Sequence, residues 1–284
     1  MALAGSCPGM AYAQLGMGTP NAPFLYLGGL VGALLYGLMH PWLKDHHAFD
    51  FAQTLEKRFE SMHLERNYFN GHFKSTATAF GVVMLAAAIG VDTLFPWQAD
   101  VADVRAVRPE WRMNPIIAGL IVGSLQIPVF VFLGSLLGAS SGYSVLSAQM
   151  FRIAPEGVLQ KHTYVRNFVS SKASWQVGLG LGIVLGSAVS SGYADSVLAT
   201  LKYHTGAPHS LSASVNSVEA FIGGLFIVYG ARFVGGCASG HGLTGLPSLH
   251  VVSWFVVPAM FAGGIATGNI LAYVLGKDAY LLRA

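Results

Sequence analysis

The chain has 284 residues, of which 53% are hydrophobic, only 10% are charged and 35 are glycine. Soluble domains carry about a quarter charged residues, so this composition excludes a soluble globule, and it has too many large apolar residues for a disordered or collagen-like chain. The net charge of +3 comes with no basic cluster interleaved with aromatic residues, so no nucleic-acid partner is indicated. We predict an all-α, polytopic helical membrane protein.

Long uncharged stretches mark the predicted crossings, because a helix needs about 20 apolar residues to span a bilayer. In chain order, the predicted apolar segments are 22–43, 77–97, 115–150, 174–191, 217–235 and 248–275. If each crosses once, the connectors 44–74 and 152–173 share one side and hold nine of the 16 Lys and Arg residues. The positive-inside rule then places these two connectors in the cytoplasm.

We expect a single membrane domain over residues 1–284. It divides into a first cysteine motif and crossing (1–43), a charged connector (44–74) and the remaining bundle (75–284), which contains a second cysteine motif at 230–245.

Apolar residues in the connector segment 51–69 fall close to one helical stripe, with charged residues between them. This pattern indicates an amphipathic helix on the membrane surface or over the bundle end, and a solvated helical connector is the alternative. The neighbouring pair His46-His47 is interpreted as solvated rather than as a metal site. The two cysteines, Cys7 and Cys237, form no CxxC and match no zinc spacing, so we expect no disulfide framework, no metal and no cofactor.

Two segments of the chain repeat one another. Residues 138–144 (GASSGYS) align in register with residues 236–242 (GCASGHG), and each follows an apolar run. A third segment, residues 5–9 (GSCPG), has a similar pattern. Corresponding interruptions in two halves of a hydrophobic chain indicate discontinuous helices that meet near the bilayer midplane. Coincidence between glycine- and serine-rich kinks is the alternative.

The first interruption is suited to begin a short helix. Pro8 fits the first helical position, with Ser6 or Cys7 as the cap, and Gly16 would end the helix. After the second interruption, Ser239 or Gly240 can begin a comparable short helix.

The physics of these interruptions favours an anion. Helix N-termini present unpaired N–H groups and about half a positive charge, and water cannot satisfy those groups in the hydrocarbon core. A small oxyanion could do so. Cys7 and Cys237 would then place a thiol, which is a weak hydrogen-bond donor, beside that anion at two breaks.

Residues 230–245 (GARFVGGCASGHGLTG) and 2–9 (ALAGSCPG) resemble the signature of the YeeE/YedE family. These membrane proteins take up thiosulfate or related sulfur compounds. The resemblance implies a helical bundle with inverted repeats and short inward-pointing helices, in which thiosulfate passes Cys7 and Cys237. It also implies a plasma (inner) membrane location and, as partners, the sulfur anion, the lipid bilayer and a cytoplasmic protein that accepts sulfur.

The chain departs from the family pattern at its beginning. Family members usually have a glycine-rich apolar helix before the first motif, whereas Met1 stands six residues before Cys7. We therefore expect a truncated form or a start at an internal methionine.

The predicted transport path comprises the residues of the two motifs. They are Cys7, Cys237, Ser6, Pro8, Gly9, Gly236, Ser239, Gly240 and His241. His241 could donate to the anion or assist the thiol, and a hydrogen-bonded packing role is the alternative. Ser140, Ser141 and Tyr143, in the cysteine-free interruption, could also line the path, although packing is equally compatible.

Arg232 is an intramembrane charge, which by default suggests function. The nearby acid, Glu219, would lie on a different face of a straight helix, so we assign Arg232 an electrostatic or structural role.

The predicted function is a permease, not an enzyme, that passes thiosulfate or a related sulfur anion through a cysteine-lined pore. Two alternatives remain open from the residues. One is a membrane thiol enzyme that performs sulfurtransfer or disulfide exchange, and it needs reactive thiolates. The other is a channel for a neutral solute, which close glycine packing would permit.

Overall fold

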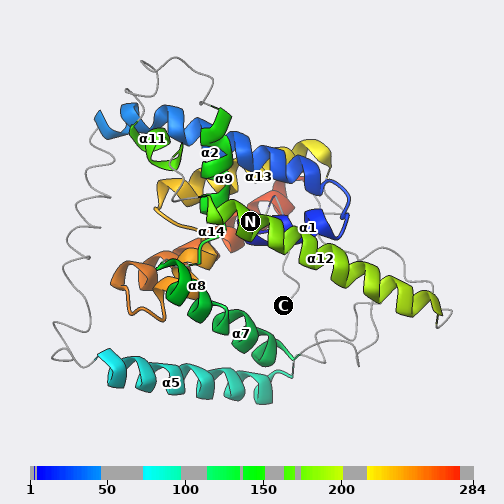
Figure 1. The fold of residues 1–284 in the computed structure, drawn as a ribbon, viewed down its shortest axis with the longest axis vertical. Coiled ribbons are helices and arrows are strands. Elements are labelled where there is room, and N and C mark those ends of the chain that lie inside the picture. Colours follow the sequence, from blue (N-terminus) through cyan, green and yellow to red (C-terminus); the bar gives the residue numbers. More distant parts are fainter. Residues whose placement is uncertain are drawn as a thin grey trace.

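The computed structural model describes residues 3, 5–45, 73–96, 114–134, 137–150, 163–169, 174–200 and 216–275. Throughout these residues the secondary structure is helical, without a strand (Figure 1). The helices are α1 (Pro8–Gly16), α2 (Ala22–Asp45), α5 (Phe73–Leu94), α7 (Pro115–Ser124), α8 (Gln126–Leu133), α9 (Ser140–Gln149), α11 (Thr163–Val169), α12 (Trp175–Thr200), α13 (Ser217–Phe233), the π-helix η5 (Ser239–Gly245) and α14 (Val251–Leu275).

Four helical segments of the described chain are long and apolar enough to cross a membrane. They are Ala22–Leu43, Ser75–Leu94, Pro115–Leu133 and Val251–Val274. The predicted all-α membrane fold is therefore confirmed. The predicted crossings at 174–191 and 217–235 form α12 and α13, and whether these helices span the membrane stays a prediction, as do the inverted repeat and the orientation. The predicted amphipathic helix and the His46-His47 pair lie outside the described residues.

The predicted apolar run from Pro115 to Met150 is divided in the structure. It begins with α7, where Asn114 Oδ1 accepts a hydrogen bond of 2.8 Å from the Ile116 backbone N–H. The helix is interrupted at Leu125, and α8 ends before Gly134, whose left-handed φ of 57° suits glycine. The next helix, α9, is a separate element and carries the serine-rich repeat.

The inner part of the molecule is a close pairing of α2 with α13 (Figure 1). A Cβ atom added at Gly28 would collide with the backbone carbonyl of Phe221, and one at Gly224 would collide with that of Leu25. The two backbones therefore touch where small residues face each other, which is how helices associate in a membrane.

Three tyrosines join α1, α2 and α9. The ring centroids of Tyr12, Tyr26 and Tyr143 lie 4.9–5.3 Å apart. Tyr143 is almost fully buried, and its hydroxyl donates to the Pro8 carbonyl over 3.0 Å. This bond holds the beginning of α1 against α9 and so positions the first cysteine motif.

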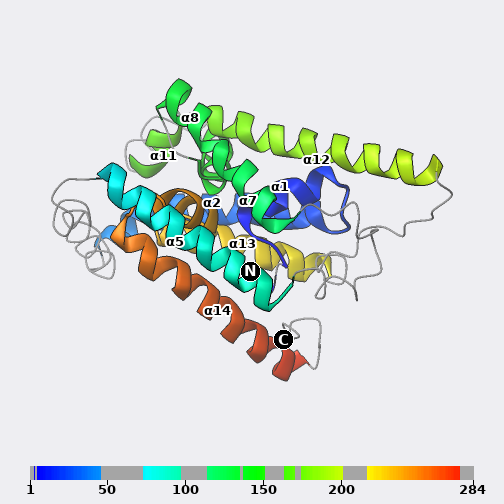
Figure 2. The ribbon, with the colours of Figure 1, turned by 90° about the horizontal axis from the view of Figure 1, so that it is seen from below.

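The outer helices pack loosely by comparison. The most hydrophobic stretches of α5 and of α7–α8 bury no residue, and that of α14 buries few. Figure 2 shows α5 and α14 along one outer side, with α12 on the opposite side. Phe80 of α5 meets Trp254 of α14 with ring centroids 5.0 Å apart. The exposed apolar faces of these outer helices fit a lipid environment.

Candidate functional site

The first cysteine motif caps α1. The helix begins at Pro8, as predicted, and Cys7 rather than Ser6 is the N-cap, because its sulfur accepts a hydrogen bond from the Met10 N–H over 3.3 Å. The Ser6 hydroxyl donates to the Cys7 carbonyl over 3.1 Å. Cys7 is half-buried. Its sulfur serves as an acceptor for the first turn, which leaves the S–H proton free to donate elsewhere.

The second motif places Cys237 between α13 and η5. Its side chain is only 1% exposed. The Ser239 Oγ lies 2.9 Å from the Cys237 Sγ. The Ser140 hydroxyl and the backbone N–H groups of Ser140 and Gly240 also lie near this sulfur. The short helix expected after Cys237 is present, but it is a π-helix rather than an α-helix, a form that is frequent at functional sites.

The two aligned segments, 138–144 and 236–242, meet in space. The Ala139 N–H donates to Ser239 Oγ over 3.3 Å. Close by, the Thr244 hydroxyl donates to the Leu137 carbonyl over 2.8 Å. Repeated sequence patterns nearly a hundred residues apart therefore form one contact.

The third interrupted segment joins the same place. A Cβ built on Gly9 would lie 3.3 Å from the Ala139 Cβ and 3.9 Å from the Cys7 Sγ. Glycine at this position lets the beginning of α1 approach the beginning of α9. The interruptions at Cys7, Ala139 and Cys237 thus converge.

Arg232 links the last turn of α13 to the first turn of α9. Its Nη2 donates to the hydroxyls of Ser140 and Ser141. The residue is 8% exposed, and its Nε is buried with no hydrogen-bond partner. In the part of the chain that the structure describes, no carboxylate forms an ion pair with Arg232. A buried cation without a counter-charge is costly, so this site favours an anion.

Glu219 has a separate role at the other end of α13. Its carboxylate accepts a hydrogen bond of 3.2 Å from the Asn216 backbone N–H and completes a capping box. This agrees with its predicted placement away from Arg232.

His241 contacts α14. Its Nδ1 lies 3.0 Å from Ser253 Oγ, and its backbone N–H donates to the Cys237 carbonyl over 2.9 Å. Its Nε2 is buried without a partner, and a Cβ on Gly236 would lie 2.8 Å from this atom. Gly236 therefore leaves room for the imidazole.

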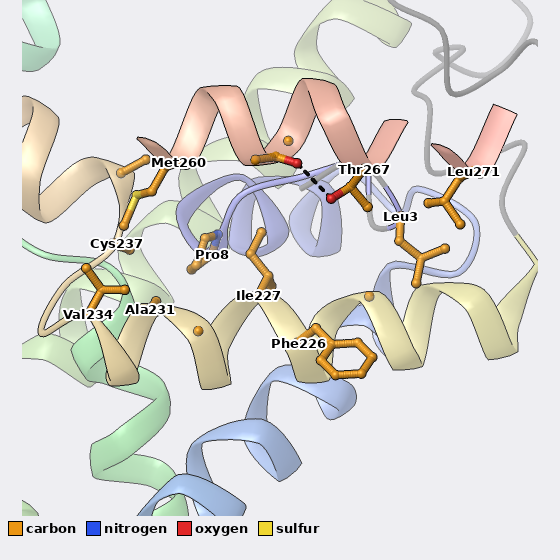
Figure 3. A pocket seen from close by; sticks show the side chains of 15 residues that line it. Leu3, Pro8, Phe226, Ile227, Ala231, Val234, Cys237, Met260, Thr267 and Leu271 are labelled. Atoms are coloured by element: carbon orange, nitrogen blue, oxygen red, sulfur yellow. Dashed lines mark hydrogen bonds between the residues drawn. The ribbon is translucent and has the colours of Figure 1, made fainter. Parts of the chain in front are cut away.

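A cavity of about 500 Å³ lies between α13 and α14, beside the start of α1. Cys237 lies at one end and Leu271 at the other, with Pro8 between them (Figure 3). The walls are mainly apolar, and the Thr267 hydroxyl donates a hydrogen bond of 2.7 Å to the Gly263 carbonyl. This space is large enough for a small solute and offers it few polar groups.

Comparison with known proteins now gives the family. A profile described as Sulphur transport matches residues 1–266. The chain belongs to this family. The match confirms the resemblance stated for the two motifs, and together with the apolar helices it identifies an integral membrane protein of a sulfur-compound transport family. No curated protein and no solved structure matches the chain.

Within this sulphur transport protein, several site contacts escaped sequence reasoning. The Ser140–Cys237 contact could have been suspected from the aligned repeat, which pairs the two segments. The α14 residues of the site lie outside both motifs, and no sequence pattern marks them. They include Met260 in the cavity wall and Ser253, the partner of His241. The described residues contain no group of three or more His, Cys, Asp or Glu side chains that could hold a metal ion.

Proposed function

We propose that the chain, as one membrane domain, carries thiosulfate or a related small sulfur-containing anion across the plasma membrane past Cys7 and Cys237. The observation that supports this most directly is Arg232, a buried cation with no carboxylate partner among the described residues, one hydroxyl away from the Cys237 sulfur. A neutral solute would leave this charge without a counter-ion.

The protein contacts the negative charge of the substrate and its terminal sulfur with two different kinds of group. The negative charge is offset by Arg232 and by the N-terminal ends of α1 and α9. The terminal sulfur lies against the thiols, which are weak donors. The apolar cavity disfavours strongly hydrated sulfate, because stripping its water is costly without full compensation.

The remaining motif residues shape this path. Close approach of neighbouring segments, including the His241 ring, is permitted by Pro8, Gly9 and Gly236. Hydrogen-bond donors are supplied or positioned by Ser6, Ser239, Gly240 and His241. On the cytoplasmic side a sulfur-accepting protein takes the delivered anion. In this role no bond of the substrate is made or broken.

The test is uptake of labelled thiosulfate by cells that express the chain, the Cys7→Ser variant or the Cys237→Ser variant. The control is Ser124→Ala, since this exposed hydroxyl of α7 bonds only the Ile121 carbonyl of its own helix. We expect uptake to fall in both cysteine variants and to persist in the control. Full uptake in both cysteine variants would remove the proposed mechanism.

A further inference from the structure

We propose that Cys237 also performs a chemical step, by accepting the outer sulfur of thiosulfate as a persulfide. The inference rests on the proposed substrate and goes beyond its carriage. The Cys237 thiolate attacks the outer sulfur, a new S–S bond forms at Cys237, and the S–S bond of thiosulfate breaks. The electron pair of the broken bond leaves with sulfite. The thiolate and the thiosulfate dianion give a persulfide anion and a sulfite dianion, so charge and electrons balance without an oxidant.

The direction of the hydrogen bonds makes the Cys237 sulfur an acceptor. Ser239 Oγ accepts from the Ala139 N–H, so its single proton is available for the sulfur 2.9 Å away. Ser140 Oγ accepts from Arg232 Nη2 and lies near Cys237, so its proton is also available for this sulfur. Each hydroxyl accepts a hydrogen bond from a nitrogen and can donate a hydrogen bond of its own to the sulfur.

The backbone N–H groups of Ser140 and Gly240 also lie near this sulfur. Hydrogen-bond donors stabilise a thiolate, which is the nucleophilic form of cysteine, whereas burial of the sulfur opposes it. Cys7 differs, because its sulfur accepts the Met10 N–H as a helix cap. The two cysteines are therefore built for different tasks, and the persulfide is expected on Cys237.

Two further observations point to a ligand beside this sulfur. Arg232 does not line the cavity that reaches Cys237, but it is more than nine-tenths buried, keeps an unpartnered Nε and bonds the Ser140 hydroxyl, so its charge favours an anion near this sulfur. The cavity of about 500 Å³ reaches Cys237 from the α14 side and leaves room for the attacking geometry.

The experiment uses the purified full chain in lipid nanodiscs, incubated with thiosulfate. We expect one sulfite per chain and a Cys237 peptide heavier by one sulfur atom. Added cyanide then removes that sulfur as thiocyanate and restores the thiol. In Cys7→Ser the only remaining cysteine is Cys237, and the added sulfur must appear there. In Cys237→Ser neither sulfite nor persulfide forms, although Cys7 is present.

Vesicle uptake separates this inference from the proposed function. Thiosulfate labelled in either its outer or its inner sulfur is supplied outside, and both labels are followed. Uptake of the two labels in equal amounts, with no sulfite and no persulfide, overturns the inference and leaves transport standing. Absence of both uptake and sulfite release overturns the two proposals together.

Ser239 is assigned as a positioning residue, which acts through Cys237. In the Cys7→Ser background, Ser239→Ala should slow alkylation of Cys237 about tenfold or more, since a hydrogen bond to a charged group is lost. Ser239→Thr keeps the hydroxyl and should restore the rate, and Ser124→Ala should not change it. Equal rates in the alanine and threonine variants would refute this role.

Discussion

The inner helices and the outer helices of this protein are all rich in apolar residues, but they pack differently. Gly28, Gly32 and Gly224 of α2 and α13 each face a backbone carbonyl with no room for a Cβ. Gly81 of α5 and Gly119 of α7 have nothing within 4 Å of the same position. The facing of small residues therefore distinguishes the closely packed pair α2 and α13 from the loosely packed α5 and α7.

The largest expected effect is at the buried charge of the inner region. Arg232→Gln should reduce thiosulfate uptake about 100-fold, because one preorganised donor to the anion is lost. Arg232→Lys keeps a charge but not the fork of donors and should recover part of the uptake. The matched control is Arg166→Gln, at an exposed arginine in the last turn of α11. If both glutamine variants transport equally, the buried cation does not attract the substrate.

The next effect compares glycines directly. Gly224→Ala should lower the free energy of unfolding by about 1–3 kcal/mol, because its Cβ meets the Leu25 carbonyl and a backbone atom must move. Gly81→Ala, on the open face of α5, should be neutral or slightly stabilising. Denaturant titration of both variants in the same detergent gives the measurement. Similar losses would show that the two regions do not differ in packing.

A smaller effect is expected at the tyrosine cluster. Tyr143→Phe removes the 3.0 Å hydrogen bond to the Pro8 carbonyl and should cost about 1 kcal/mol of stability. Uptake should also fall, since the start of α1 loses its anchor. Tyr229→Phe is the control, because its hydroxyl contacts only the Met39 sulfur, a weak acceptor, at 3.7 Å. Thermal unfolding and uptake, measured side by side, would reveal an unanchored α1.

The smallest effect is expected on the outer side. Phe80→Leu removes the ring contact with Trp254 and should cost about 0.5 kcal/mol or less in folding, with unchanged uptake. A large loss of transport in this variant would mean that α5 does more than cover the site.

Local chemistry made part of this structure predictable. Proline at the first helical position marks the starts at Pro8 and Pro115. Uncharged runs mark the spans, and paired small-residue interruptions mark the two breaks. Each of these signals is contained within a few consecutive residues.

Long-range contacts were not predictable in the same way. The bond of Arg232 to Ser140 joins residues 92 positions apart. The partner of His241 belongs to α14, which has no motif. The pairing of α2 with α13 depends on which glycine faces which carbonyl, and periodicity within one helix does not carry that information.

Cys7 caps α1 through its sulfur, which accepts the Met10 N–H. Serine is among the strongest residues at such a position, whereas a thiol accepts weakly. An oxygen at position 7 would therefore secure the first turn at least as well, and helix architecture alone gives no reason for the heavier atom. Replacing the sulfur of Cys7 by oxygen keeps the helix cap and removes the thiol, so this change tests the chemistry of the sulfur apart from its role in helix structure.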